Sequence, residues 1–150
     1  MNHPDYNSPA ELKKILDENG FSMQKKFGQN FLINAAARTK LIDALDIQKG
    51  TSVWEVGPGL GAMTSELLER GANLTVFEID RGFISLISQF FQSYSQQDSF
   101  RIIEGDVIKN WYGQTQNGTM LPQRFFGNLP YNIARSEERR VGKECEGMCR

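Results

Sequence analysis

Short apolar runs alternate with amphipathic segments along most of this chain, and the two patterns predict different elements. Runs rich in β-branched and aromatic side chains predict buried strands. Such runs occur at residues 52–56, 74–79, 100–104 and 124–127. The segments after the first two runs carry apolar residues at helical spacing. This β-α-β-α-β alternation predicts an α/β fold with a parallel, doubly wound sheet and right-handed crossovers.

Two helices are expected before the first strand. Ser8 can cap a helix that has Pro9 in its first turn and runs to about Glu18, before Asn19 and Gly20 end it. Residues 21–33 look irregular. Asn34 can cap a second helix, in which Leu41, Ile42 and Leu45 are predicted to face the core.

Two more helices are expected between the strands. One follows the glycine-rich segment 57–61 and ends at Gly71, with Met63, Leu67 and Leu68 on one face. The other is capped by Asp80 and spans about 81–93. The polar stretch 93–99 and the glycine-containing stretch 112–122 are predicted to be loops.

Composition places limits on function. The chain has 150 residues, enough for one ordinary domain, and 39% of them are hydrophobic. A net charge of −1 gives no global attraction to nucleic acid, so RNA binding would need a local patch. There is no long apolar run, no leader-like segment and no cysteine before Cys145, so we expect an intracellular protein without a membrane span, a thiolate metal site or a disulfide framework. His3, the one histidine, falls in a predicted mobile end.

Several candidate ligand-binding residues follow the predicted strands. In a parallel sheet, ligands lie at the carboxyl ends of the strands. Gly57 and Gly59 follow the first strand and would let the backbone approach a ligand, although a tight turn without a ligand is the alternative. Glu78, at the end of the second strand, can accept hydrogen bonds from both ribose hydroxyls. Asp106, after the third strand, can accept from an adenine amino group while Val107 covers the ring; its alternative role is to cap a turn.

The fourth strand leads into Asn128-Leu129-Pro130-Tyr131, a pattern suited to an exocyclic aromatic amine. Acceptors from Asn128 and the following carbonyls would hold the amine hydrogens and favour a more tetrahedral nitrogen. Pro130 stiffens the turn. Tyr131 offers a face for a flipped base, an interaction of about 1–3 kcal/mol. The alternative is a proline turn with a buried tyrosine. Methyl transfer to such an amine needs no strong base, because positioning and desolvation supply most of the catalysis.

These motifs, together with Lys25-Lys26-Phe27-Gly28-Gln29-Asn30-Phe31-Leu32, resemble those of the ribosomal RNA adenine dimethyltransferases, over about residues 20–135. The resemblance implies a Rossmann-like class I methyltransferase that uses S-adenosyl-L-methionine. It implies dimethylation of N6 of two adjacent adenines in small-subunit (16S) rRNA, by a monomer acting on the pre-30S particle in the cytoplasm. It also implies that Asn30 and Leu32 flank the methionine portion of the cofactor, that Asn128 lies where cofactor and amine meet, and that Lys25 and Lys26 contact RNA phosphate.

Three other functions stay open at this point. One is a large-subunit rRNA adenine methyltransferase of the macrolide-resistance type, which usually has isoleucine where this chain has Leu129. The second is a ribosome assembly factor that binds RNA without catalysis. The third is an amine methyltransferase of DNA or of protein glutamine, a class that typically shows Asn-Pro-Pro-Tyr and lacks the segment 25–32. An intact cofactor site and an intact Asn128–Tyr131 segment argue against the second.

The resemblance divides the chain into three parts. Residues 1–34 form an N-terminal helix and a segment that contacts cofactor and RNA, and residues 35–135 form a partial methyltransferase domain, truncated after the fourth strand. Residues 136–150 are rich in charge, contain both cysteines and lack strand or helix periodicity, so we interpret them as foreign to the native protein; an ordinary charged tail is the alternative. We expect a chain of this form to be inactive by itself, although its parent is an active enzyme.

Overall fold

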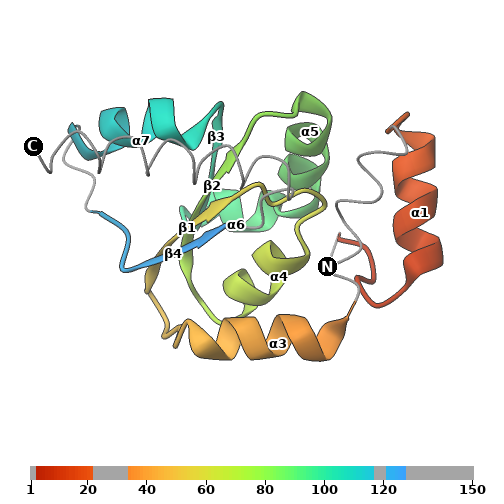
Figure 1. Ribbon diagram of the computed structural model, residues 1–150, viewed down its shortest axis with the longest axis horizontal. Coiled ribbons are helices and arrows are strands. Elements are labelled where there is room, and N and C mark those ends of the chain that lie inside the picture. The colour runs from red at the N-terminus through yellow and green to blue at the C-terminus, as the bar shows by residue number, and fades with distance from the viewer. Residues whose placement is uncertain (1–2, 22–33, 117–120, 128–150) are drawn as a thin grey trace, which may run out of the picture.

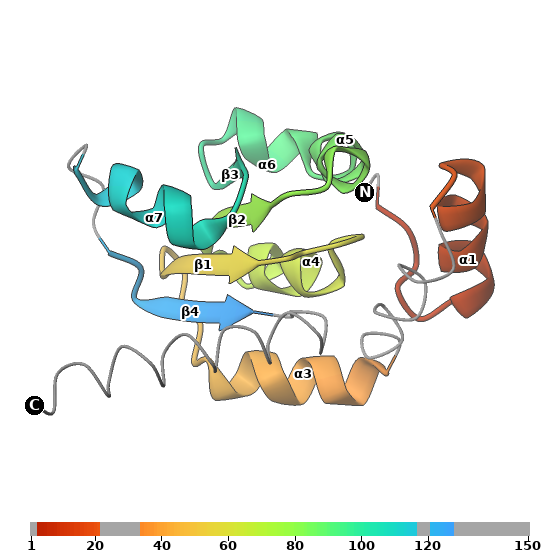
Figure 2. The same ribbon diagram turned by 45° about the horizontal axis from the view of Figure 1, so that its top comes forward.

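The computed structural model describes residues 3–21, 34–116 and 121–127. Its centre is a parallel four-stranded sheet with the strand order β3-β2-β1-β4. The strands are β1 (Ser52–Val56), β2 (Asn73–Glu78), β3 (Phe100–Glu104) and β4 (Arg124–Gly127). Figure 2 shows β1, β2 and β4 as arrows that point the same way. The predicted α/β class and all four predicted strands are confirmed, with β2 shifted by one residue.

The helices cover the two faces of the sheet unequally. One face carries α4 (Ala62–Glu69), α5 (Arg81–Phe90) and α6 (Gln92–Gln96), with α3 (Ala35–Ala44) packed on α4. The other face carries α7 (Val107–Gln116). Figure 1 shows the sheet between α7 and the pair α3 and α4, with α1 (Pro9–Glu18) at one end of the molecule.

Capping side chains fix the starts of three helices where the sequence predicted them. The Ser8 hydroxyl accepts a hydrogen bond from the Glu11 amide at 3.3 Å, and Asn34 accepts from the Ala37 amide at 3.1 Å. The Asp80 carboxylate accepts from the Gly82 amide at 2.9 Å. These bonds satisfy amides that have no partner within the first helical turn.

Two predicted loops contain helices instead. Residues 93–99 were expected to be irregular, but α6 occupies Gln92–Gln96, and its Tyr94 packs against the core. Residues 112–122 were also expected to be irregular, but α7 continues to Gln116. Packing of Val107 against the sheet anchors the first turn of α7, and Gly113 in its interior costs only about 1 kcal/mol. In both places tertiary contact outweighs weak local propensity.

The main core lies between the sheet and α3, α4 and α5. Its most deeply buried side chains come from these elements and are apolar: Ile42, Val53, Met63, Leu67, Leu74, Val76, Ile87 and Phe91. Leu41 is 39% exposed, so its predicted core position is wrong. Its neighbour Ile42 is buried, and the buried stripe of α3 runs through Arg38 and Ile42, one helical turn apart.

A smaller apolar cluster lies on the opposite face of the sheet, where Trp54, Val56 and Phe77 meet Val107 of α7. Phe125 pairs with Trp54 in the sheet and is 57% exposed. Among the described helices, none is long and apolar enough to cross a membrane.

Candidate functional site

The carboxyl ends of the strands form a single edge on which several predicted site residues meet. In the sheet register Val56 lies beside Phe77 on one side and Gly127 on the other, and Glu78 lies beside Glu104. The segments that follow β1, β2 and β3 therefore begin next to one another, as the parallel topology requires.

The glycine loop, residues 57–61, leaves β1 and turns into α4. Gly57, Gly59 and Gly61 have positive φ angles of 68°, 57° and 87°, which favour glycine because a side chain there would be strained. The Gly57 amide donates to the Phe77 carbonyl at 2.9 Å, and the Gly61 amide donates to the Pro58 carbonyl at 2.9 Å. The loop is thus a fixed turn whose backbone lies at the sheet edge.

Glu78 connects β2 to this loop. One carboxylate oxygen, Oε1, accepts from the Ile79 amide at 2.8 Å and from the Asp80 amide at 2.9 Å. The other, Oε2, accepts from the Gly59 amide at 3.4 Å, a long bond. Burial raises the pKa of Glu78, while the backbone donors act in the opposite direction. The side chain is therefore held at one oxygen, and the second oxygen lies beside the glycine loop with capacity for further donors.

Glu55 is a second buried acid at this edge, and the sequence analysis did not single it out. It is 1% exposed, and its Oε2 accepts a hydrogen bond from the Thr64 hydroxyl of α4 at 2.7 Å. Burial raises its pKa to about 7; the Thr64 bond opposes this rise and the charge of Glu78 adds to it. An acidic residue among the apolar residues 53–56, two positions before Gly57, was the available signal.

Asp106 follows β3 and Gly105 at the same edge. Its Oδ1 accepts from the Ile108 amide at 2.9 Å, so the side chain caps the start of α7, which was the alternative role considered for it. Val107 is half-buried against the Trp54 cluster. The structure brings Asp106 and Val107 to the edge that carries Glu78, and their contacts with an adenine ring stay a prediction.

The other predicted site residues lie outside the described residues, and their roles stay predictions. These residues are Lys25, Lys26, Asn30, Leu32, Asn128, Pro130 and Tyr131. The fourth strand ends at Gly127, which lies beside Val56 in the sheet. Val56 directly precedes the glycine loop. Within the described ranges, no group of three or more histidine, cysteine or acidic side chains could hold a metal ion.

Comparison with known proteins identifies relatives of this chain. The model of the family "Ribosomal RNA adenine dimethylase" matches residues 20–136. A protein of Treponema denticola named ribosomal RNA small subunit methyltransferase A is 59% identical over 135 residues, covering 89% of this chain and 45% of that protein. Its namesake in Treponema pallidum strain Nichols is 44% identical over 131 residues, covering 87% of this chain and 44% of that protein. The chain thus spans less than half the length of these relatives.

A solved structure supports the same fold. The crystal structure of the 23S rRNA methyltransferase ErmE superposes with a TM-score of 0.51 at 23% identity, covering 73% of this chain and 41% of that one. The described residues therefore share the Rossmann-like α/β fold of that protein. Because the family match extends over most of its length, this chain belongs to the ribosomal RNA adenine dimethylase family.

Proposed function

We propose that this chain binds S-adenosyl-L-methionine at the carboxyl edge of its sheet, as part of a protein that dimethylates N6 of two adjacent adenines in small-subunit rRNA. The observation that carries the proposal is the Glu78 carboxylate held against the Gly59 amide of the glycine loop, in a member of this family. A 59% identical relative is named for methylation of the small ribosomal subunit.

The residues at the edge fit the groups of this cofactor. Among the described residues, Glu78 Oε2 accepts one long bond, from the Gly59 amide. A carboxylate oxygen accepts more than one donor, so ribose hydroxyls suit it. The backbone at Gly57 and Gly59 would lie against the methionine and ribose portions. Asp106 would accept from the adenine amino group, beside Val107. Asn30, Leu32 and Asn128 complete the proposed site, by the resemblance.

The cofactor supplies a methyl group on a sulfonium, which an uncharged amine can attack. Asn128 and the carbonyls stiffened by Pro130 would orient the adenine amine, and Tyr131 would stack on the flipped base. Catalysis then rests on positioning, and the amine proton passes to solvent. Lys25 and Lys26 would hold RNA phosphates. The proposed partner is the pre-30S particle, and the proposed setting is the cytoplasm, with the protein a monomer.

The names of the relatives favour the small-subunit substrate over the large-subunit alternative. The second alternative, an assembly factor without catalysis, predicts RNA binding without methyl transfer. A chimera of this chain with the remaining half of the Treponema denticola protein would separate the two. Methyl transfer to small-subunit RNA that Asn128→Ala abolishes, with RNA binding retained, supports the enzyme; RNA binding without any transfer overturns it.

Cofactor binding can be tested on the chain itself by calorimetric titration with S-adenosylhomocysteine. Glu78→Gln places an amide donor toward the Gly59 amide and removes an acceptor, so we expect affinity to fall at least about tenfold. Glu18→Gln on the exposed side of α1 is the matched control and should bind like the wild type. Unchanged affinity of Glu78→Gln would remove the basis for this site.

A further inference from the structure

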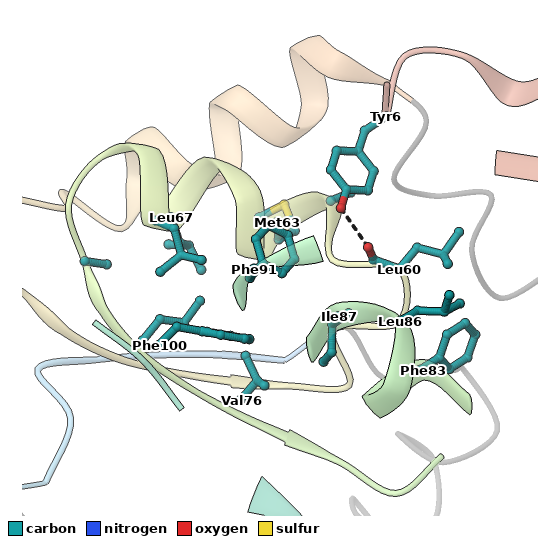
Figure 3. Packing of buried hydrophobic residues seen from close by; sticks show 14 of the residues in the cluster. Tyr6, Leu60, Met63, Leu67, Val76, Phe83, Leu86, Ile87, Phe91 and Phe100 are labelled. Atoms are coloured by element: carbon teal, nitrogen blue, oxygen red, sulfur yellow. Dashed lines mark hydrogen bonds between the residues drawn. The ribbon is translucent and has the colours of Figure 1, made fainter. Parts of the chain in front are cut away.

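The N-terminal segment reaches the back of the glycine loop through one tyrosine. The Tyr6 hydroxyl donates a hydrogen bond of 2.7 Å to the Leu60 carbonyl, across 54 residues of sequence. Figure 3 shows the Tyr6 hydroxyl directed at this carbonyl, above the buried apolar side chains. Tyr6 is 6% exposed, so the bond is shielded from water. A shielded bond of this kind fixes the orientation of the peptide group that accepts it.

The loop is closely packed on the same side. A Cβ at Gly61 would lie 2.6 Å from Phe91 Cε2 and 3.3 Å from the Tyr6 hydroxyl, so only glycine lets these rings approach. Phe91 is 0% exposed, and the His3 ring stacks between the two aromatics, with centroids 5.4 Å from Tyr6 and 5.8 Å from Phe91. The prediction that His3 lies in a mobile end is therefore wrong, because its ring is half-buried and its Nε2 lies 3.3 Å from the Ser65 hydroxyl.

The segment that carries Tyr6 is itself held by Arg38. This buried guanidinium donates to the Tyr6 carbonyl at 3.4 Å and to the Asn7 side chain at 2.6 Å. It also forms an ion pair with Glu66 of α4, with Nε and Oε1 2.9 Å apart. Tyr6 is therefore fixed at its backbone by α3 and α4, and its hydroxyl transmits that position to the loop.

The chemistry of the pair suits a permanent donor. Burial, with the charge of Glu55 as a smaller contribution, raises the pKa of Tyr6 well above its ordinary value, so the phenol keeps its proton. Leu60 follows Gly59, whose amide faces Glu78. The loop is thus held by the Tyr6 hydroxyl at the Leu60 carbonyl and by the Glu78 carboxylate at the Gly59 amide.

We propose that Tyr6 is a positioning residue for cofactor binding: its bond to the Leu60 carbonyl holds loop 57–61 in the conformation that receives S-adenosyl-methionine. This inference rests on the proposed function. When only a fraction of molecules has the competent loop, the apparent dissociation constant rises in inverse proportion to that fraction. Loss of one buried hydrogen bond shifts such an equilibrium by about 3–10-fold.

The test is calorimetric titration of the chain with S-adenosylhomocysteine, using Tyr6→Phe to remove the hydroxyl alone. We expect the dissociation constant to rise about 3–10-fold. Tyr94→Phe, on α6, controls for loss of a tyrosine hydroxyl elsewhere. Ile42→Val, in the core of α3, controls for a general loss of stability, since it removes one methyl group from a fully buried side chain. Both controls should bind like the wild type.

Three results would overturn the inference. Wild-type affinity in Tyr6→Phe would do so, and so would equal weakening in Tyr6→Phe and Ile42→Val, which would indicate stability alone. No binding by the wild type would overturn the proposed cofactor site and this inference together. If Tyr6→Phe does not fold, His3→Ala decides: removal of the ring stacked on Tyr6 should weaken binding about twofold by the same loop equilibrium, and unchanged affinity refutes the role.

Discussion

Replacement of Gly61 by alanine tests how firmly Phe91 and Tyr6 confine the glycine loop. Two costs add in the folded protein. A left-handed conformation, here with φ of 87°, costs a side chain about 1–2 kcal/mol. The new Cβ would also lie 2.6 Å from a carbon of the fully buried Phe91, and overpacking of this kind costs about 1–3 kcal/mol. We therefore expect Gly61→Ala to lower the free energy of unfolding by about 2–5 kcal/mol.

Gly50 offers a matched control. Its φ is 84°, but nothing lies within 4 Å of a Cβ built there. Gly50→Ala should therefore show the conformational cost alone, and the entropy that alanine removes from the unfolded chain is common to both variants. Urea denaturation followed by far-ultraviolet circular dichroism measures both free energies.

One result would refute this reasoning. If Gly61→Ala destabilises the protein no more than Gly50→Ala, Phe91 moves freely and the loop is not confined from behind. A double-mutant cycle adds a second check: Phe91→Leu should recover part of the Gly61→Ala loss, because it removes the ring that the new Cβ meets.

Three further predictions concern charged side chains. Glu55 has a folded-state pKa of about 7 against an ordinary value of 4.5, so the folded state binds its proton more tightly, and stability is lost as pH rises from about 4.5 through 7. The loss of unfolding free energy is roughly 3 kcal/mol, at about 1.4 kcal/mol per pH unit. Urea titrations at pH 5 and pH 8 should show a smaller difference in unfolding free energy for Glu55→Gln than for the wild type. An equal difference would contradict the raised pKa of Glu55. Asp106→Asn should keep the helix cap and the melting temperature but weaken S-adenosylhomocysteine binding about tenfold. Asp106→Ala should in addition lose about 1 kcal/mol of stability. Calorimetry measures the loss of binding, and melting curves measure the loss of stability. Arg38→Ala should cost about 3–5 kcal/mol because it leaves the Glu66 carboxylate without its buried partner, and Arg70→Ala, at a more exposed ion pair, should cost less than about 1 kcal/mol in the same denaturation assay.

Local features of this fold could be predicted because their causes lie within a few residues. Ser8, Asn34 and Asp80 each bond an amide two or three positions later, and such spacing is visible in the sequence. Strands β1 and β2 were predictable because burial on both faces demands continuous apolar runs. Helix α6 was missed because its polar residues show no helical period, and Tyr94 alone ties it to the core.

Long-range contacts at the site could not be predicted in this way. Nothing in the neighbourhood of Tyr6 indicates that its hydroxyl meets Leu60, because the pairing depends on how α3 and α4 place the N-terminal segment. Glu78 was predicted as a ligand acceptor from its place after a strand. Its bonds to Ile79 and Asp80, which set the direction of its second oxygen, follow from the backbone turn at the strand end.

The position of β1 between β2 and β4 has a consequence for how the protein assembles. β2 follows β1 after one helix, but β4 docks on β1 from far along the chain, where the Ser52 amide meets the Gln123 side chain across 71 residues. Closing such a long loop slows folding, and a polypeptide emerging from the ribosome offers its N-terminal elements first. We therefore predict that the glycine loop and Glu78 form with an early β1-α4-β2 nucleus. We expect β4, which leads to Asn128, to join β1 after β2 does, so a ligand of the β1-α4-β2 unit would have part of its site before β4 docks.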